Sequence, residues 1–177
     1  MPAIVTAIHG NIIHQADCEA IVNSANPNLR AGSGVCGAIY GAAGPALEPC
    51  SMQLAPLQLA NAVATPGFNL PNRLIIHCRG PRYLFDPEPA ANLALCLENI
   101  LLLAEQENVR RLALPAISMG VYAYPAEEAV PILVQTAIRL ATRLEQLEEI
   151  RFVVTSNTLL SLFQSAIRSF SVEFGLY

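Results

Sequence analysis

A run of asparagines and glycines follows a short apolar stretch near the N-terminus and has the composition of a phosphate-binding loop. The apolar residues at 20–22 predict a strand, and Asn23 and Asn26 come directly after it. Gly32-Ser33-Gly34 then leads into a helix predicted at 35–43. A glycine loop before a helix N-terminus points backbone N–H groups at an anion, and glycine lets the backbone approach a phosphate closely. The spacing indicates either a diphosphate cradle or an ordinary strand-to-helix turn.

A second loop of similar composition comes later in the chain. The strand predicted at 111–117 is followed by Ser118-Met119-Gly120-Val121-Tyr122. The first loop is neither a Walker A sequence nor a Gly-x-Gly-x-x-Gly fingerprint. Ligands of parallel α/β sheets bind beyond the carboxyl ends of strands, and a diphosphate needs donors on both sides. The two loops together therefore indicate more than either one alone.

Predicted strands and helices alternate along the chain. Strands are predicted at 3–9, 20–23, 59–65, 73–79, 111–117, 150–155 and 172–174. Helices are predicted at 35–43, 46–55, 90–106 and 158–168, and a further one starts at Tyr124-Pro125 with a polar stripe that reaches Gln146. Pro131 is expected to kink that helix or to shift its start. The alternation predicts a largely parallel sheet between layers of helices.

The composition sets limits on the class of protein. A length of 177 residues predicts one domain with a full hydrophobic core, and 53% apolar with 14% charged residues suits a sheet buried on both faces. The most apolar run, at 93–104, contains Glu98 and Asn99 and is too short to span a bilayer. The N-terminus does not have the pattern of a signal peptide. No membrane partner is expected.

Charge and the reactive side chains exclude further classes. There is no lysine, and the net charge of −4 argues against general nucleic-acid binding, although a small anion held by backbone amides is compatible with it. The three histidines share no ligand spacing with cysteines or acids, so neither a metal site nor another cofactor is expected. Five scattered cysteines predict reduced thiols in the cytoplasm: Cys18, Cys36, Cys50, Cys78 and Cys96.

Several segments resemble the macro domain family, whose members bind ADP-ribose. The first motif is the sequence VNSAN at 22–26, followed by GSGVCGAI at 32–39 and AAG at 42–44. The second is PAISMGVYAYP at 115–125, and shorter segments between the motifs also match in the right order. The resemblance covers nearly the whole chain. It implies a three-layer α/β/α macro domain fold with a mixed, largely parallel central sheet, as a single domain over residues 1–177.

The resemblance also implies roles for particular residues. Asn11 stands where the family has an acid that accepts from the adenine amino group; its amide keeps an acceptor, and a plain turn residue is the alternative. Asn26 matches the asparagine that holds the distal ribose, with an Asx turn as the alternative. Asn23 is expected to brace the loop through backbone hydrogen bonds. Tyr122 is expected either to cover the distal ribose or to pack in the core. The implied ligand-binding residues are Asn11, Ile12, Asn23, Asn26, Gly32, Ser33, Gly34, Val35, Ser118, Met119, Gly120, Val121 and Tyr122.

Three positions depart from the family pattern. Cys36 replaces an Asp that, in the hydrolytic branch, helps to position or activate water. A thiol with an ordinary pKa of about 8.5 is a poor base, unless the helix N-terminus lowers that pKa, and the alternative is simple packing. Tyr40 replaces a common histidine. Thr155 begins a stretch where many relatives carry an aromatic residue near the adenosine, for which Phe174 or another ring could substitute.

The resemblance implies binding of ADP-ribose and hydrolysis of its esters. The substrate would be an ADP-ribosylated protein or O-acetyl-ADP-ribose, and water would attack the anomeric carbon of the distal ribose. The residues assigned to the reaction are Asn26, Gly34 and Cys36, with the substrate's own phosphate as an alternative aid to the water. A module that binds ADP-ribose without cleaving it is the main alternative. A nucleotide or RNA-end binder is disfavoured by the acidic balance of the chain.

Overall fold

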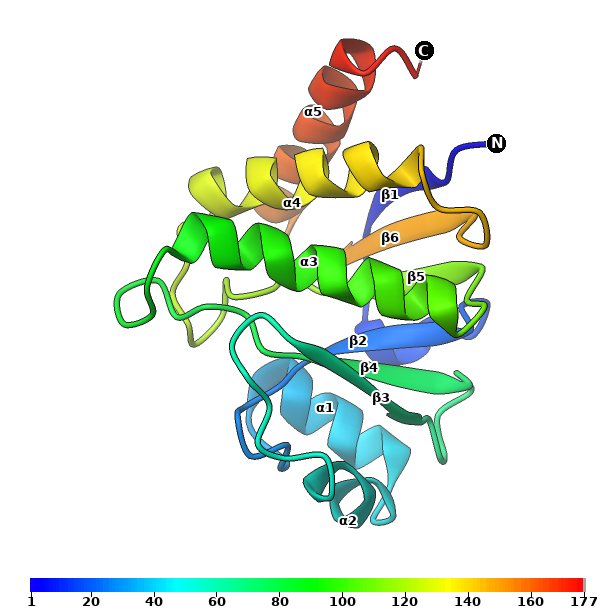
Figure 1. The fold of residues 1–177 in the computed structure, drawn as a ribbon, viewed down its shortest axis with the longest axis vertical. Helices are drawn as coiled ribbons and strands as arrows, with labels where there is room; N and C mark the ends of the chain where they lie inside the picture. The colour runs from blue at the N-terminus through cyan, green and yellow to red at the C-terminus, as the bar shows by residue number, and fades with distance from the viewer. Residues whose placement is uncertain (177) are drawn as a thin grey trace.

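The structure is a computed structural model that describes residues 1–176, and a six-stranded sheet forms its centre (Figure 1). The order across the sheet is β1-β6-β5-β2-β4-β3. Neighbouring strands are parallel, except that β3 runs antiparallel to β4 at one edge. The predicted mixed, largely parallel sheet is therefore confirmed. The strands are β1 (Ile4–His9), β2 (Ala20–Ser24), β3 (Ala62–Pro66), β4 (Leu74–Cys78), β5 (Arg111–Leu114) and β6 (Glu149–Val154).

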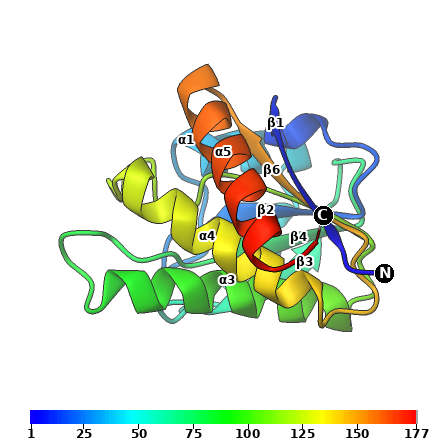
Figure 2. The same cartoon turned by 90° about the horizontal axis from the view of Figure 1, so that it is seen from above.

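Helices cover both faces of this sheet and make the three expected layers. Figure 2 shows α1 and α3 on opposite sides of the strands. Val22 packs with α3 and α4 in one core, whereas the adjacent Ile21 packs with α1 in another, as the alternation of side chains along a strand requires. The helices are α1 (Gly34–Ala43), α2 (Leu47–Met52), α3 (Pro89–Gln106), α4 (Ala126–Ala141) and α5 (Asn157–Glu173), with a 3-10 turn η1 (Ile12–His14).

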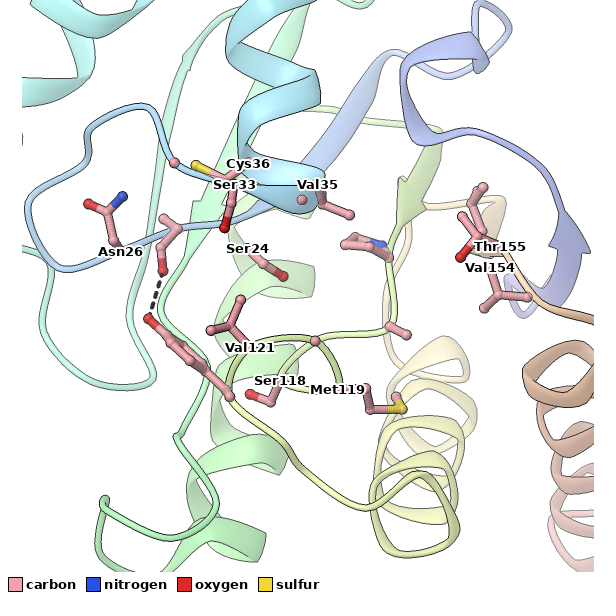
Figure 3. A pocket seen from close by; sticks show the side chains of 18 of the residues that line it. Ser24, Asn26, Ser33, Val35, Cys36, Ser118, Met119, Val121, Val154 and Thr155 are labelled. Carbon is pink, nitrogen blue, oxygen red and sulfur yellow. Dashed lines mark hydrogen bonds between the residues drawn. The ribbon is translucent and has the colours of Figure 1, made fainter.

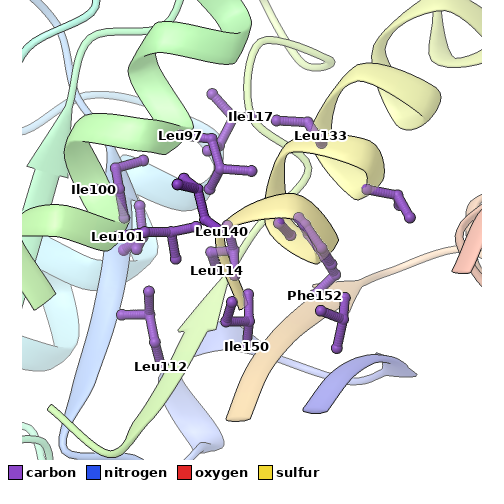
Figure 4. Packing of buried hydrophobic residues seen from close by; sticks show 14 of the residues in the cluster. Leu97, Ile100, Leu101, Leu112, Leu114, Ile117, Leu133, Leu140, Ile150 and Phe152 are labelled. Carbon is purple, nitrogen blue, oxygen red and sulfur yellow. The ribbon is translucent and has the colours of Figure 1, made fainter. Parts of the chain in front are cut away.

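The larger core lies between the sheet and the helices α3, α4 and α5. Leu97 and Ile100 of α3 meet the strand residues Leu112 and Ile150 there, all of them fully buried (Figure 4). The ring of Phe152 stacks on that of Phe163 from α5 at 4.7 Å between centroids. Among residues 1–176, no helix combines the length and apolar character needed to cross a membrane.

Some predicted element boundaries are wrong for identifiable reasons. Residues 172–174 are not a strand, because the buried side chains of Phe163, Ile167 and Ser171 continue a helical spacing of four and α5 runs to Glu173. The strand predicted to reach 117 ends at Leu114, since the proline that follows has no N–H to donate to a neighbouring strand.

Two further differences concern β3 and α4. The edge strand β3 begins at Ala62 rather than at residue 59. Helix α4 begins at Ala126 and continues past Pro131, so this proline does not shift its start. The helix ends at Ala141, and Gln146, the last residue of the predicted polar stripe, lies beyond it.

The sheet order brings the two glycine-containing loops to the same edge. Strands β2 and β5 are parallel neighbours, with Ala20 opposite Leu112, so the loops that follow them leave the sheet side by side. Strand β6 is the next neighbour of β5 and ends at the same edge. The carboxyl ends of three adjacent strands therefore surround one region, which is where ligands bind in such sheets.

Candidate functional site

A cavity of about 400 Å³ lies between the two loops at this edge of the sheet (Figure 3). Its volume is in the range of small-molecule sites. Asn26, Ser33 and Cys36 lie on one side of it, and Ser118, Met119 and Val121 on the other. It is lined by Ser24, Ala25, Asn26, Gly32, Ser33, Gly34, Val35, Cys36, Pro115, Ala116, Ser118, Met119, Gly120, Val121, Tyr122, Val153, Val154, Thr155 and Leu159.

The first wall is the loop after β2 together with the N-terminus of α1. Gly34 begins the helix at φ 58°, a left-handed conformation that favours glycine. The preceding residue, Ser33, makes no side-chain capping bond. Among the described residues, the N–H groups of Gly34, Val35 and Cys36 have no hydrogen-bond partner. The first turn of α1 thus presents free donors, as in helix N-termini that bind anions.

The opposite wall is the loop at 118–122. It is folded by short-range backbone bonds, including Tyr124 N–H to Ser118 O at 2.9 Å, and Ser118 itself has φ 65°. The N–H groups of Gly120, Val121 and Tyr122 take part in no hydrogen bond within residues 1–176. Both walls therefore offer unpaired backbone donors around a single cavity.

A hydrogen bond from Tyr122 joins the two walls. Its hydroxyl donates to the carbonyl oxygen of Ala25 at 3.4 Å (dashed in Figure 3). Tyr122 is half-buried and lines the cavity, so its side chain does more than pack in the core.

Asn26 lines the cavity and also closes a turn of its own loop. Its Oδ1 accepts from the Arg30 N–H at 3.2 Å, and its Nδ2 donates to the Arg30 carbonyl oxygen at 2.7 Å. The Asx-type turn weighed from the sequence is therefore present. A carboxamide has two N–H groups and two oxygen lone pairs, so one of each remains for a ligand.

Cys36 lies at the base of the first wall and is only 6% exposed. Its thiol donates to the Arg30 carbonyl oxygen at 3.5 Å, and the Asn23 amide lies 3.8 Å from its sulfur. Burial raises the pKa of the Cys36 thiol. This direction is opposite to the one expected if the helix N-terminus generated a thiolate, and the group is a neutral thiol at physiological pH.

Three predicted ligand-binding residues do not reach the cavity. Asn11 is exposed and caps η1, accepting from the Ile13 N–H at 3.2 Å, while Ile12 is buried in the core beneath α1. Asn23 is fully buried, and it bonds to the side chain of His77 at 3.0 Å rather than to backbone groups. The turn interpretation of Asn11 holds in this structure, and the predicted backbone bracing by Asn23 is wrong.

The two remaining departures from the family pattern lie in different places. The Tyr40 hydroxyl is buried and donates to the Leu29 carbonyl oxygen at 3.0 Å. Thr155 lines the cavity and is exposed. Phe174 caps the opposite end of α5 from Leu159, which lines the cavity, so Phe174 cannot substitute for a ring there.

The sequence did not point to seven of the lining residues, six of them apolar. Most of the missed positions end or follow strands β2, β5 and β6, and one lies in the first turn of α5; the strand order that brings them together is not visible in the sequence. They are Ser24, Ala25, Pro115, Ala116, Val153, Val154 and Leu159. Among the described residues, none of those that line the cavity is Asp, Glu, His, Lys or Arg. Within residues 1–176, no three His, Cys, Asp or Glu side chains are grouped to hold a metal ion.

The fold and the cavity define an α/β domain with two donor loops at the carboxyl edge of its sheet, and comparisons with known proteins agree. A family model described as Macro domain matches residues 22–133. The chain is 42% identical to an uncharacterised protein of Fusobacterium nucleatum, over 77% of this chain and 78% of that one. It is 40% identical to a Klebsiella pneumoniae protein named O-acetyl-ADP-ribose deacetylase, over 87% and 91% of the two chains. The chain belongs to the macro domain family.

Solved structures give the same result for the fold. The Oceanobacillus iheyensis macrodomain with ADP superposes with a TM-score of 0.92 at 31% identity, covering 97% of this chain and 94% of that one. The Trypanosoma brucei macrodomain in complex with ADP gives 0.85 at 27% identity, over 92% and 68% of the two chains.

Proposed function

We propose that this chain binds ADP-ribose in the cavity between the two loops and hydrolyses ADP-ribose esters, acting as one macro domain over residues 1–177. The observation that carries the proposal is the set of unpaired backbone N–H groups at Gly34–Cys36 and Gly120–Tyr122, which border one cavity. A diphosphate is the part of ADP-ribose that needs donors on two sides. The relative named O-acetyl-ADP-ribose deacetylase and the macrodomain solved with ADP support both parts of the proposal.

The ligand would lie along the cavity with its diphosphate between the loops. Gly32–Val35 and Ser118–Tyr122 would bind the phosphate oxygens through their backbone. Asn26 would use its remaining N–H and lone pair on the distal ribose hydroxyls. The adenosine would extend toward Thr155, at the end of β6.

Hydrolysis would use a water molecule held beside the distal ribose. For an ester at the anomeric carbon, the water oxygen forms the new bond to that carbon, and the ester oxygen leaves with the bonding electrons as a carboxylate. The proton of the water passes to a phosphate oxygen of the substrate, because the lining has no acidic or basic side chain and Cys36 is a neutral thiol. For an acetyl ester elsewhere on the ribose, the water oxygen forms the new bond to the acetyl carbonyl carbon, the bond from that carbon to the ribose oxygen breaks, and the ribose oxygen takes the proton given up by the water and leaves as a hydroxyl, with acetic acid as the other product. The fixed geometry of ligand and water supplies the acceleration.

An ADP-ribose-binding module without turnover is the second candidate function. The same lack of an ionised group in the lining favours it, because nothing on the protein is placed to take the proton of the water. Both candidates share the binding site and differ only in the chemical step.

The proposed natural substrate is a protein carrying ADP-ribose on a carboxylate side chain, with O-acetyl-ADP-ribose as the small-molecule counterpart. Neither a membrane nor a nucleic acid is proposed as a partner. The proposed location is the cytoplasm, and the free cysteines Cys18, Cys36, Cys50, Cys78 and Cys96 support it, because such thiols persist in a reducing compartment.

The test is incubation with a glutamate-linked mono-ADP-ribosylated protein and, separately, with O-acetyl-ADP-ribose, followed by mass spectrometry of the products. Asn26→Ala should abolish release of ADP-ribose, whereas Asn28→Ala, an exposed change in the same loop that does not line the cavity, should not. Turnover of neither substrate, with ADP-ribose bound in a calorimetric titration, would favour the binding module. Absence of ADP-ribose binding would refute both functions.

A further inference from the structure

A chain of buried polar side chains lies beneath the first wall of the cavity. Asn23 on β2 and His77 on β4 are opposite each other in the sheet register, and both are fully buried. Asn23 Nδ2 lies 3.0 Å from His77 Nδ1, and His77 Nε2 lies 2.9 Å from the Thr65 hydroxyl on β3. Neither His77 nor Thr65 lines the cavity.

The ring of His77 has a defined role in these bonds. Burial lowers its pKa to about 4, so the ring is neutral at physiological pH. With the Asn23 amide nitrogen facing the ring, Nδ1 must be the acceptor, because an amide nitrogen only donates. The ring hydrogen is therefore on Nε2 and is donated to Thr65.

This series of hydrogen-bonded side chains continues from Asn23 to the cavity lining. The Asn23 amide also lies 3.8 Å from the sulfur of Cys36, whose thiol donates to the carbonyl oxygen of Arg30 at 3.5 Å. The same carbonyl oxygen accepts from Asn26 Nδ2 at 2.7 Å. Figure 3 shows Cys36 and Asn26 together on this side of the cavity. A continuous set of contacts thus runs from His77 to the two cavity residues of the first loop.

Helix α1, which is linked to His77 through Asn23 and Cys36, also contacts it directly through Tyr40. The ring of Tyr40, one turn beyond Cys36, meets the imidazole edge to face at 6.1 Å between centroids. His77 is therefore linked to both Cys36 and Tyr40 on the helix whose first turn forms the cavity wall. Burial requires partners for both ring nitrogens, and here one of the two bonds leads to Asn23 and from there toward the site.

We propose that His77 is a positioning residue of the site: through Asn23 and Cys36 it holds Asn26 and the Gly32–Val35 loop in the arrangement that fits the distal ribose. This inference rests on the proposed function, ADP-ribose binding. It gives Cys36 the role of a hydrogen-bonding link in the wall, in place of a base.

The test uses the full chain and two nucleotides that differ only at the distal end, ADP and ADP-ribose. Two variants each keep one side of the imidazole. His77→Asn places an amide oxygen near the position of Nδ1 and keeps an acceptor for Asn23, whereas His77→Gln reaches toward Thr65 and leaves the Asn23 amide without an acceptor.

His77→Gln should weaken ADP-ribose binding and slow ester hydrolysis by about tenfold, the size of losing one buried hydrogen bond, while ADP binding stays within about twofold of the unmodified chain. His77→Asn should recover most of the preference for ADP-ribose over ADP. A role in overall stability alone would weaken the binding of both nucleotides equally, and that result would overturn the proposal, as would an unchanged preference in His77→Gln.

Thr65→Val keeps the test decisive if the histidine variants do not fold. It removes the hydroxyl that accepts from Nε2, and Thr136→Val in α4 is the matched control, a buried threonine away from the cavity. Thr65→Val should reduce the ADP-ribose preference about threefold and Thr136→Val should leave it unchanged. An unchanged preference in both overturns the proposal. If the unmodified chain binds neither nucleotide, the proposed function itself fails.

Discussion

Cys36 is the residue whose chemistry departs most from what hydrolysis asks of an acid at its position. Its thiol is directed to the Arg30 carbonyl oxygen, and burial raises the pKa of this thiol. A group in that state neither takes a proton from water nor carries charge at pH 7. What it contributes is a bond that fixes the loop carrying Asn26.

A pH–rate profile distinguishes two roles of Cys36: a thiol that only hydrogen-bonds the loop, and a thiolate that takes a proton from water. Because the Cys36 thiol stays protonated, ester hydrolysis should be independent of pH between about 6 and 8, and Cys36→Ala should lower the rate by about three- to tenfold without changing the shape of the profile. A rate that rises through this range in the unmodified chain, and is flat in Cys36→Ala, would mean that a thiolate acts as the base.

Thr155 offers a second test at the level of one side chain. It is exposed and lines the cavity at the end of β6, where the neighbouring lining residues Val153, Val154 and Leu159 carry no aromatic ring. A base stacked on an aromatic ring gains about 1–3 kcal/mol, so Thr155→Phe should tighten ADP binding about fivefold or more in a calorimetric titration. Thr158→Phe is the control, exposed near the start of α5 but outside the lining. Equal affinities for both variants would contradict an adenosine position beside Thr155.

At the scale of the elements, the backbone of helix α1 and that of the loop before it come into close contact at one point. A Cβ atom on Gly37 would lie 2.5 Å from the Gly32 carbonyl oxygen, so the loop crosses the helix where only glycine fits. Gly41, one turn further along the same helix, has no atom within 4 Å of such a Cβ position. The two glycines form a matched pair on one element.

Gly37→Ala and Gly41→Ala should therefore have opposite effects. The first should destabilise the fold by about 1–3 kcal/mol through overpacking and weaken ADP-ribose binding, because the Gly32 end of the wall must move. The second should stabilise it by about 0.5–1 kcal/mol, since alanine loses less chain entropy in a helix. Thermal unfolding with an ADP-ribose titration measures both effects. Normal binding by Gly37→Ala would show that the crossing does not set the cavity wall.

These elements also show what a sequence can predict. The two cavity loops are predictable because glycine and small polar residues directly after apolar strands are typical of ligand-binding loops in parallel sheets. The bond between Asn23 and His77 is not, because the residues are 54 positions apart and meet only when β2 and β4 become neighbours. Asn11 follows a strand at the same edge, yet its amide is used to cap η1, and local backbone bonding of this kind is invisible in a motif.

On the scale of the whole molecule, the sheet joins stability to the site. His77 is buried between strands and helix α1, and burial favours its neutral form, so protonating it costs stability. The contacts that position the cavity loop therefore also belong to the core of the protein. Acid should therefore lower the stability of the fold and disturb the cavity loop together.

Stability should fall with acid below neutral pH because of His77. The pKa of His77 is lowered from 6.5 to about 4 in the folded chain. Between these two values the unfolded chain binds a proton that the folded chain does not, so the free energy of unfolding falls as the pH falls. The shift corresponds to about 3 kcal/mol lost between pH 7 and pH 4. Asp17, whose pKa is lowered to about 2 beside Arg151, loses its contribution to the free energy of unfolding only below about pH 4, outside this window.

Urea unfolding at pH 7 and at pH 4.5 tests this expectation. The free energy of unfolding should fall less between the two pH values for His77→Asn than for the unmodified chain, whereas His14→Asn, at an exposed position, should behave as the unmodified chain does. An equal loss in all three would mean that another group carries the acid sensitivity.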